Sequence, residues 1–243
     1  MNGLIALVGS GEYLPVMDDV DRYLLAHCCA DGRAPRVICL PTAAGLEGEE
    51  SWGRWNRMGE EHFHMLGAQV STLPIIDRAS ADDPQHAAVI ENADLVYFSG
   101  GNPMHLYQTM SGSKAWAAAE KAWERGAVYA GCSAGAMILA ENIPNWRSLG
   151  GSPQKGFGMF PNSMIFPHFD RMLVWQKVSL PILQTFIHEK EYTLGIDEET
   201  ALIGKLDGEW QVMGRQKVYV ITHREVKSYS AGEKIILPGG KLV

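Results

Sequence analysis

The chain has little cysteine, and its cysteines are not arranged as a scaffold. Cys28 and Cys29 are adjacent, the other two of the four cysteines stand alone, and no C-x-x-C pair occurs. This pattern does not fit a disulfide framework, and it predicts reduced thiols in a cytoplasmic protein. No pair or trio of His, Asp or Glu has ligand spacing within one predicted element, so no metal site is predicted.

Basic charge and long apolar runs are also missing. The net charge is -7 and the isoelectric point is about 5.6, which argues against a nucleic-acid partner and against binding to anionic lipid. No apolar stretch approaches the length of a bilayer span, so no membrane partner is expected. Residues 1–9 lack a basic n-region and are predicted to form a buried strand rather than a signal peptide.

A dinucleotide-binding fingerprint is incomplete as well. Gly9 and Gly11 follow the first apolar run, but Leu14 stands where the pattern G-x-G-x-x-G needs its third glycine. The segment is predicted to be a Gly-rich turn after a buried strand, without a nucleotide.

Short apolar runs and helical patterns alternate through the first part of the chain. The predicted strands are residues 4–8, 36–40, 69–76, 95–98 and 127–130. Strands that alternate with helices predict an α/β fold with a mostly parallel sheet flanked by helices. In such sheets ligands bind beyond the carboxyl ends of the strands, where these runs end in Gly, Ser or Thr.

The pattern changes after residue 140. Residues 142–166 are rich in Gly, Pro, Asn and Ser and are predicted to form a long surface excursion, and residues 173–189 are predicted to be helical. Residues 193–196, 200–203, 212–222 and 234–237 are predicted to be strands, the last two antiparallel. No linker or repeat divides the chain, so we expect one domain over residues 1–243 with a β-rich C-terminal extension.

A nucleophile elbow is predicted at residues 128–136, which read VYAGCSAGA. Ser133 would stand at the apex of a sharp strand-to-helix turn, with Gly131 and Gly135 allowing strand and helix to approach closely. The backbone N–H of Ala134 would point to a developing oxyanion. Gly101, in the Gly-Gly-Asn turn after a buried strand, is the candidate for the second oxyanion donor.

The candidate base is His168, which ends a short apolar run, whereas most of the eight histidines fall on predicted helix surfaces or loops. Two acids remain open for orienting it: Glu198, in an acidic cluster between two strand-like runs, and Glu141, on the predicted helix after the elbow. Asn102 and Arg171 are the candidates for binding substrate. The guanidinium of Arg171 suits a substrate carboxylate, with a local pair to Asp170 as the alternative.

Three motifs, in this order, resemble the serine peptidases that include aspartyl dipeptidase and cyanophycinase. They are FSGGN at residues 98–102, GCSAGA at 131–136 and PHF at 167–169, and GIDEETAL at 195–202 looks like the acidic motif of the cyanophycinase branch. The resemblance covers about the whole chain. Two positions depart from the cyanophycinase pattern, because Pro103 and Pro167 stand where that branch has glutamine.

The resemblance implies a fold like the class I glutamine amidotransferases, a flavodoxin-like sandwich. It also implies Ser133 as the nucleophile, His168 as its base, Glu198 as the orienting acid, and Gly101 with Ala134 as the oxyanion hole. A small peptide substrate, no metal or organic cofactor, and a homodimer are expected on the same ground. The alternatives are a non-peptidase protein of the same fold that binds small molecules, and an esterase or amidase that uses the same serine.

Overall fold

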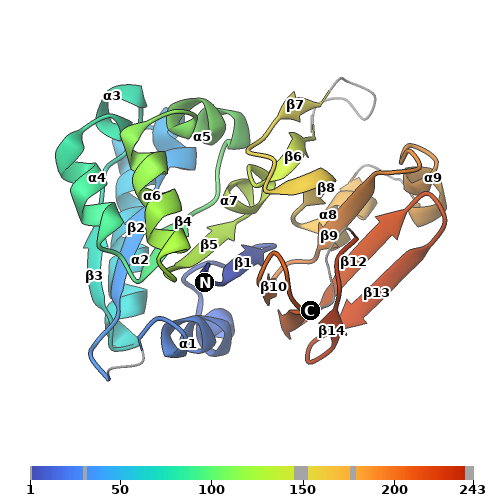
Figure 1. Ribbon diagram of the computed structural model, residues 1–243, viewed down its shortest axis with the longest axis horizontal. Helices are drawn as coiled ribbons and strands as arrows, with labels where there is room; N and C mark the ends of the chain where they lie inside the picture. The colour runs from blue at the N-terminus through green and yellow to red at the C-terminus, as the bar shows by residue number, and fades with distance from the viewer. Residues whose placement is uncertain (1, 30–31, 145–152, 176–178, 239–243) are drawn as a thin grey trace.

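Buried apolar runs in the first half of the chain form parallel strands, as predicted. The computed structural model describes residues 2–29, 32–144, 153–175 and 179–238. The parallel strands are β1 (Ile5–Val8), β2 (Arg36–Leu40), β3 (Gln69–Thr72), β4 (Leu95–Phe98) and β5 (Val128–Cys132). They lie side by side in the order β1-β5-β4-β2-β3, so β1 and β5, which are remote in sequence, are neighbours (Figure 1).

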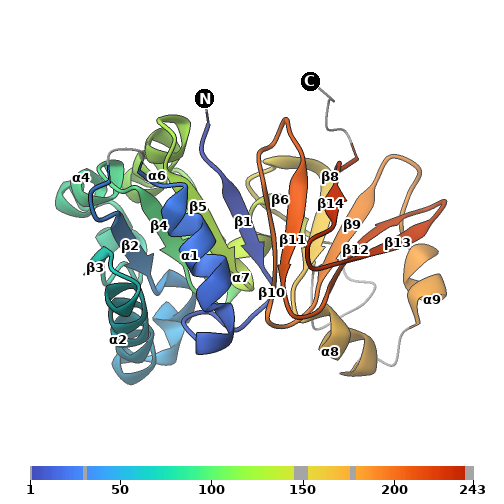
Figure 2. The ribbon, with the colours of Figure 1, turned by 90° about the horizontal axis from the view of Figure 1, so that it is seen from below.

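Helices cover both faces of this parallel part. The helical segments are η1 (Pro15–Met17), α1 (Asp18–Ala26), η2 (Thr42–Glu47), α2 (Glu49–Met65), α3 (Arg78–Ala81), α4 (Pro84–Glu91), α5 (Pro103–Met110) and α6 (Lys114–Glu124). Helices α1 and α2 lie on one face, and α4, α5 and α6 on the other (Figures 1 and 2). None of the helices in the described ranges is both long and apolar enough to span a bilayer.

Side-chain alternation along the strands explains the two layers. Ile5 and Leu7 of β1 join one hydrophobic cluster, and Ala6 and Val8 join the other, because successive side chains point to opposite faces. Strands buried on both faces are apolar at every position. This is why their sequences are continuous apolar runs rather than alternating patterns.

The parallel strands continue into antiparallel ones. Strand β10 (Thr200–Gly204) pairs antiparallel with β1, and β11 (Trp210–Gly214) and β14 (Lys234–Ile235) follow it to the edge. The result is one eight-stranded mixed sheet. The prediction of an α/β fold is confirmed. The prediction of a mostly parallel sheet holds in part: the pairings among β1, β5, β4, β2 and β3 are parallel, and strands from the C-terminal part add antiparallel pairings to the same sheet.

A second, six-stranded sheet is built from the rest of the chain, in the order β13-β12-β9-β8-β6-β7 (Figure 1). Its strands are β6 (Ala140–Ile143), β7 (Gln154–Lys155), β8 (Phe160–Phe166), β9 (Tyr192–Ile196), β12 (Lys217–Thr222) and β13 (Val226–Ser230). One hydrophobic cluster contains side chains from both sheets, among them Leu202 and Leu194. The two sheets therefore share a core.

Three predictions for this region are wrong. The supposed excursion over residues 142–166 contains strands β7 and β8, although residues 145–152 lie outside the described ranges. Residues 212–222 are not one strand, because β11 pairs with β10 in the first sheet and β12 with β9 in the second. The helix predicted at 173–189 is divided into α8 (Phe169–Trp175) and α9 (Leu180–Gln184), with a proline in the first turn of α9.

A buried carboxylate fixes the start of β4. Asp94 is 3% exposed and accepts hydrogen bonds from the side chain of Arg33 at 2.6 and 2.8 Å and from the backbone N–H of Arg36 at 2.8 Å. Burial alone would raise the pKa of Asp94, but hydrogen bonds from Arg33 and Arg36 outweigh it and hold the pKa well below its usual range.

We expect Asp94→Asn to lower the free energy of unfolding at pH 7 by about 2 kcal/mol, because both guanidinium groups lose their counter-charge. The carboxylate of Asp94 stabilises the fold above its unfolded pKa near 4, and this stabilisation is lost as the pH falls below that value. Urea unfolding between pH 7 and 3 should therefore show the variant and the wild type converging in acid. Asp207→Asn, in an exposed turn, is the control and should leave stability unchanged. A constant difference at all pH values would contradict this account.

Candidate active site

Ser133 stands at a strained turn between β5 and the short helix α7 (Ala134–Met137). Its backbone has φ 48° and ψ -104°, a conformation that a serine rarely adopts. The N–H of Ser133 donates to the carbonyl oxygen of Val8 on β1 at 2.9 Å, which ties the turn to the neighbouring strand. The strand–turn–helix geometry of a nucleophile elbow is present.

Two glycines make this turn sterically possible. A Cβ atom on Gly131 would lie 2.4 Å from the carbonyl carbon of Gly135, and one on Gly135 would lie 2.7 Å from the carbonyl oxygen of Phe98. These obstacles are backbone atoms, which cannot move aside as a flexible side chain can. At Gly131 and Gly135 there is therefore room for a hydrogen atom but not for a side chain, and the backbones of strand, turn and helix lie in direct contact.

His168 follows β8 of the second sheet and lies against Ser133. Its Nε2 is 3.2 Å from the Ser133 hydroxyl oxygen, and its Nδ1 is 3.0 Å from Oε1 of Glu198. With Glu198 ionised, Nδ1–H donates to the carboxylate and Nε2 is left to accept the serine proton. The backbone of His168 is also left-handed, with φ 48°, so both ends of this contact sit in uncommon conformations.

Glu198 is held at several atoms. Its backbone N–H donates to Asp170 at 3.0 Å, its Oε2 accepts from Nε of Arg171 at 3.1 Å, and its carbonyl oxygen accepts from the Gln216 side chain at 3.1 Å. Arg171 thus pairs with Glu198 and not with Asp170, the partner named in the sequence-based alternative. Each oxygen of the Glu198 carboxylate therefore has a partner: Oε1 contacts His168 and Oε2 contacts Arg171.

The neighbouring acids have other partners. Asp197 is buried, and burial raises its pKa to about 6, while its Oδ2 accepts the Lys217 N–H at 3.2 Å. Glu199 pairs with Arg215 at 2.9 Å. Only the middle carboxylate of the cluster contacts His168, and all three acids lie in the turn between β9, which ends at Ile196, and β10, which begins at Thr200.

Glu141, the other acid left open by the sequence, lies elsewhere. It is on strand β6 rather than on the predicted helix, and it accepts the N–H of Asn162 at 2.7 Å and bonds Lys155 at 3.1 Å. Helix α7 ends at Met137, before Glu141. Strand β6, which carries Glu141, belongs to the second sheet. The contact to His168 is made by Glu198.

Two backbone N–H groups beside Ser133 have no acceptor among the described residues: those of Gly101 and Ala134. Gly101 has φ 141°, and it lies against the carbonyl of Ala43 on η2. Asn102, predicted to bind substrate, uses its Oδ1 to accept the N–H groups at the start of α5, at 3.0 and 3.1 Å. Its oxygen therefore serves as a helix cap.

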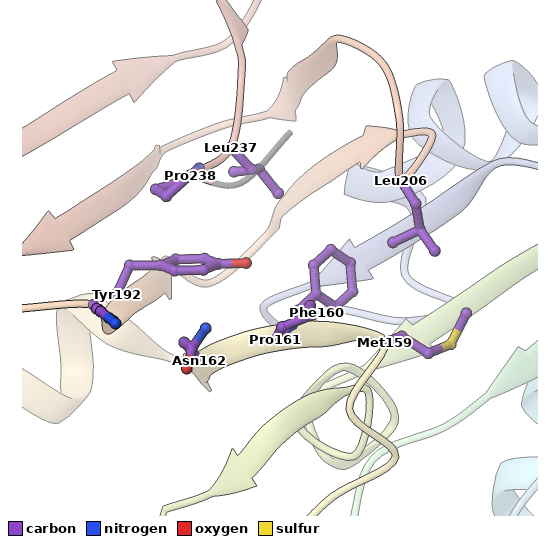
Figure 3. A pocket seen from close by; sticks show the side chains of 9 residues that line it. Met159, Phe160, Pro161, Asn162, Tyr192, Leu206, Leu237 and Pro238 are labelled. Atoms are coloured by element: carbon purple, nitrogen blue, oxygen red, sulfur yellow. The ribbon is translucent and has the colours of Figure 1, made fainter. Parts of the chain in front are cut away.

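A cavity of about 300 Å³ lies at the opposite ends of β8 and β9 from His168 and Glu198 (Figure 3). Phe160, Tyr192 and Leu237 are among its lining residues, and none of the Ser133, His168 and Glu198 side chains borders it. Among the described residues no group of three or more His, Cys, Asp or Glu is arranged to hold a metal ion.

The α/β fold and the elbow serine define a serine hydrolase. Residues 5–209 match Peptidase family S51, and because this span is most of the chain, the chain belongs to that family. This confirms the resemblance to aspartyl dipeptidase and cyanophycinase that the sequence motifs suggested, and the enzyme is a serine peptidase of this family.

Relatives and solved structures agree with this assignment. A cyanophycinase of Synechococcus elongatus is 24% identical over 235 residues, which are 92% of this chain and 69% of the relative. The crystal structure of a peptidase from an acI-B1 Actinobacterium is 34% identical with a TM-score of 0.85 and covers 97% of each chain. A protein assigned as peptidase E from Listeria monocytogenes EGD-e is 18% identical with a TM-score of 0.58 and covers 96% of this chain and 100% of its own. The last likeness concerns the fold, which is of the class I glutamine amidotransferase type.

We expect Gly131→Ala to destabilise the protein by about 3 kcal/mol, because the added methyl group meets backbone that cannot yield. Gly53→Ala is the matched control: in α2 the added methyl would meet only the flexible end of Arg57 at 3.7 Å, so stability should rise by up to about 1 kcal/mol. Thermal unfolding of both variants, monitored by circular dichroism, checks the pair. Equal melting temperatures for the two would contradict the packing argument.

Proposed function

We propose that this chain hydrolyses short peptides, with Ser133 as nucleophile, His168 as general base and Glu198 as the acid that orients the histidine. The observation that carries this proposal is the continuous contact from the Ser133 hydroxyl through both ring nitrogens of His168 to Glu198. Membership of a serine peptidase family supports it independently.

In the first half of the reaction, Ser133 Oγ attacks the scissile carbonyl carbon while His168 Nε2 takes the hydroxyl proton. The C–O bond to serine forms and the carbonyl π electrons move to oxygen. The N–H groups of Gly101 and Ala134 stabilise this oxyanion. His168 then returns the proton to the leaving amine, the C–N bond breaks, and an acyl-enzyme remains on Ser133.

In the second half, water replaces the amine. His168 takes a proton from the water, whose oxygen attacks the acyl carbon, and then gives the proton to Ser133 Oγ as the ester bond breaks. Glu198 remains ionised throughout and stabilises the imidazolium that forms twice per turnover. Neither half of the reaction changes an oxidation state, so hydrolysis needs no redox partner.

The guanidinium of Arg171 is a group that can bind the carboxylate of an acidic substrate residue. Its Nε donates to Glu198, the carboxylate that contacts His168, and its side chain is 58% exposed. A guanidinium fork can hold one carboxylate through Nε and another through its terminal nitrogens. The similarity to relatives named cyanophycinases supports aspartyl peptides as the first substrates to test.

The first experiment measures hydrolysis of a panel of dipeptides, including α-aspartyl and β-aspartyl linkages. We expect wild-type protein to cleave at least one member and Ser133→Ala to lose at least about a thousandfold in kcat. Loss of cleavage without loss of the folded state, checked by circular dichroism, is the supporting result. Cleavage that persists in Ser133→Ala would exclude this serine as the nucleophile.

A matched pair of variants tests the acid. Glu198→Gln should lower kcat by about a hundredfold or more, because a neutral amide cannot stabilise the imidazolium. Glu141→Gln changes a glutamate that accepts the backbone N–H of Asn162 and does not contact His168, and it should leave kcat within about twofold. Steady-state kinetics on the best dipeptide of the panel decides between them. The opposite ranking would move the orienting role to Glu141.

A further inference from the structure

One buried carboxylate beside the elbow has no part in the mechanism described so far. Glu12 lies in the Gly-rich turn after β1 and is 7% exposed. A buried carboxylate is costly unless its oxygens are satisfied, so the groups that satisfy it show what it holds together.

The two oxygens of Glu12 contact the two sides of the proposed oxyanion hole. Oε1 accepts the backbone N–H of Gly100 at 2.9 Å, and Oε2 accepts the thiol hydrogen of Cys132 at 2.9 Å. Gly100 immediately precedes Gly101, and Cys132 immediately precedes Ser133. One side chain therefore bridges the loop after β4 and the end of β5.

The contact at Gly100 is tight. A Cβ atom at this position would lie 2.9 Å from Oε1 of Glu12 and 3.3 Å from Cβ of Ser133. The loop backbone is therefore pressed between the carboxylate and the nucleophile. A shift of the carboxylate would move the peptide that leads into Gly101.

The loop that carries Glu12 is itself rigidly placed. Tyr13, the next residue, has φ 64° and a buried ring. That ring packs against Tyr97, Phe63 and Trp55, with centroid distances of 5.0, 6.0 and 6.4 Å. An uncommon backbone conformation persists only where the surroundings hold it, and here the aromatic cluster does so.

The thiol partner is a donor and not a competing nucleophile. Burial, and next the negative charge of Glu12, raise the pKa of the Cys132 thiol well above its usual value. The thiol therefore remains protonated and can donate its hydrogen to Oε2.

We propose that Glu12 is a positioning residue for the oxyanion hole, holding the N–H of Gly101 at the distance from Ser133 that a tetrahedral intermediate needs. The inference rests on the proposed function of Ser133. Oxyanion donors act only when they are already in place as charge develops, so a loosened Gly100 peptide lowers the rate of the chemical step more than it weakens binding. Glu12 itself touches neither the substrate nor His168.

The test measures labelling of Ser133 by a fluorophosphonate probe, followed by intact-mass spectrometry. This reagent needs an activated serine and an oxyanion site but no known substrate. Glu12→Ala should lower the maximal labelling rate by about ten- to a hundredfold, with the half-saturating probe concentration within about twofold of wild type. Glu12→Gln keeps an oxygen that can accept the Gly100 N–H and should restore most of the rate.

Glu12→Asp is the second variant, because Glu12→Ala removes an acceptor from a buried N–H and can unfold the protein. Aspartate keeps the charge but is one methylene shorter, so it should also lower the maximal rate. The pH dependence of labelling should stay unchanged in every folded variant. A general loosening of the site would shift it.

The proposal is overturned if folded Glu12→Asp labels at the wild-type rate, or if Glu12→Gln is as slow as the folded Glu12→Ala or Glu12→Asp variant. The first result would show that the contact is not needed, and the second that an oxygen able to accept the Gly100 N–H does not suffice. Ser133→Ala separates this outcome from failure of the proposed function: if that variant still labels at the wild-type rate, the nucleophile is misassigned whatever Glu12 does.

Discussion

The contact of backbone with backbone at the elbow is the constraint on which the site depends. Strand β5 and helix α7 approach so closely at Gly131 and Gly135 that no side chain fits between them. This approach forces Ser133 into a left-handed conformation and leaves the N–H of Ala134 without an acceptor among the described residues. The strained backbone of Ser133 and the unpaired N–H of Ala134 thus accompany one packing arrangement.

The three side chains of the proposed triad come from both sheets and the link between them. Ser133 follows β5 of the eight-stranded sheet, and His168 follows β8 of the six-stranded sheet. Glu198 lies in the short link between β9 and β10, where the chain passes from one sheet to the other. The shared hydrophobic core fixes the sheets relative to each other, so it also sets the distances between these three groups.

The three acidic residues in the link between β9 and β10 differ in their partners. Glu198 shares its oxygens between His168 and Arg171, and Glu199 pairs with Arg215. Asp197 makes no ion pair within the described part of the chain, and burial raises its pKa to about 6. Adjacent carboxylates in one short link therefore have different chemistry because each faces a different environment.

The sequence by itself determined the parallel strands, the elbow at Ser133 and the position of His168, because these follow from local patterns: apolar runs, small residues at a turn, and a histidine at a strand end. It left Glu198 and Glu141 unresolved, and it missed β7, β8 and the role of Glu12. It also placed the C-terminal strands in an extension, whereas β10, β11 and β14 join the first sheet. Each of these depends on pairing between segments far apart in the chain, such as β1 with β10. The tertiary structure decided them, because only burial of a common core brings those segments into register.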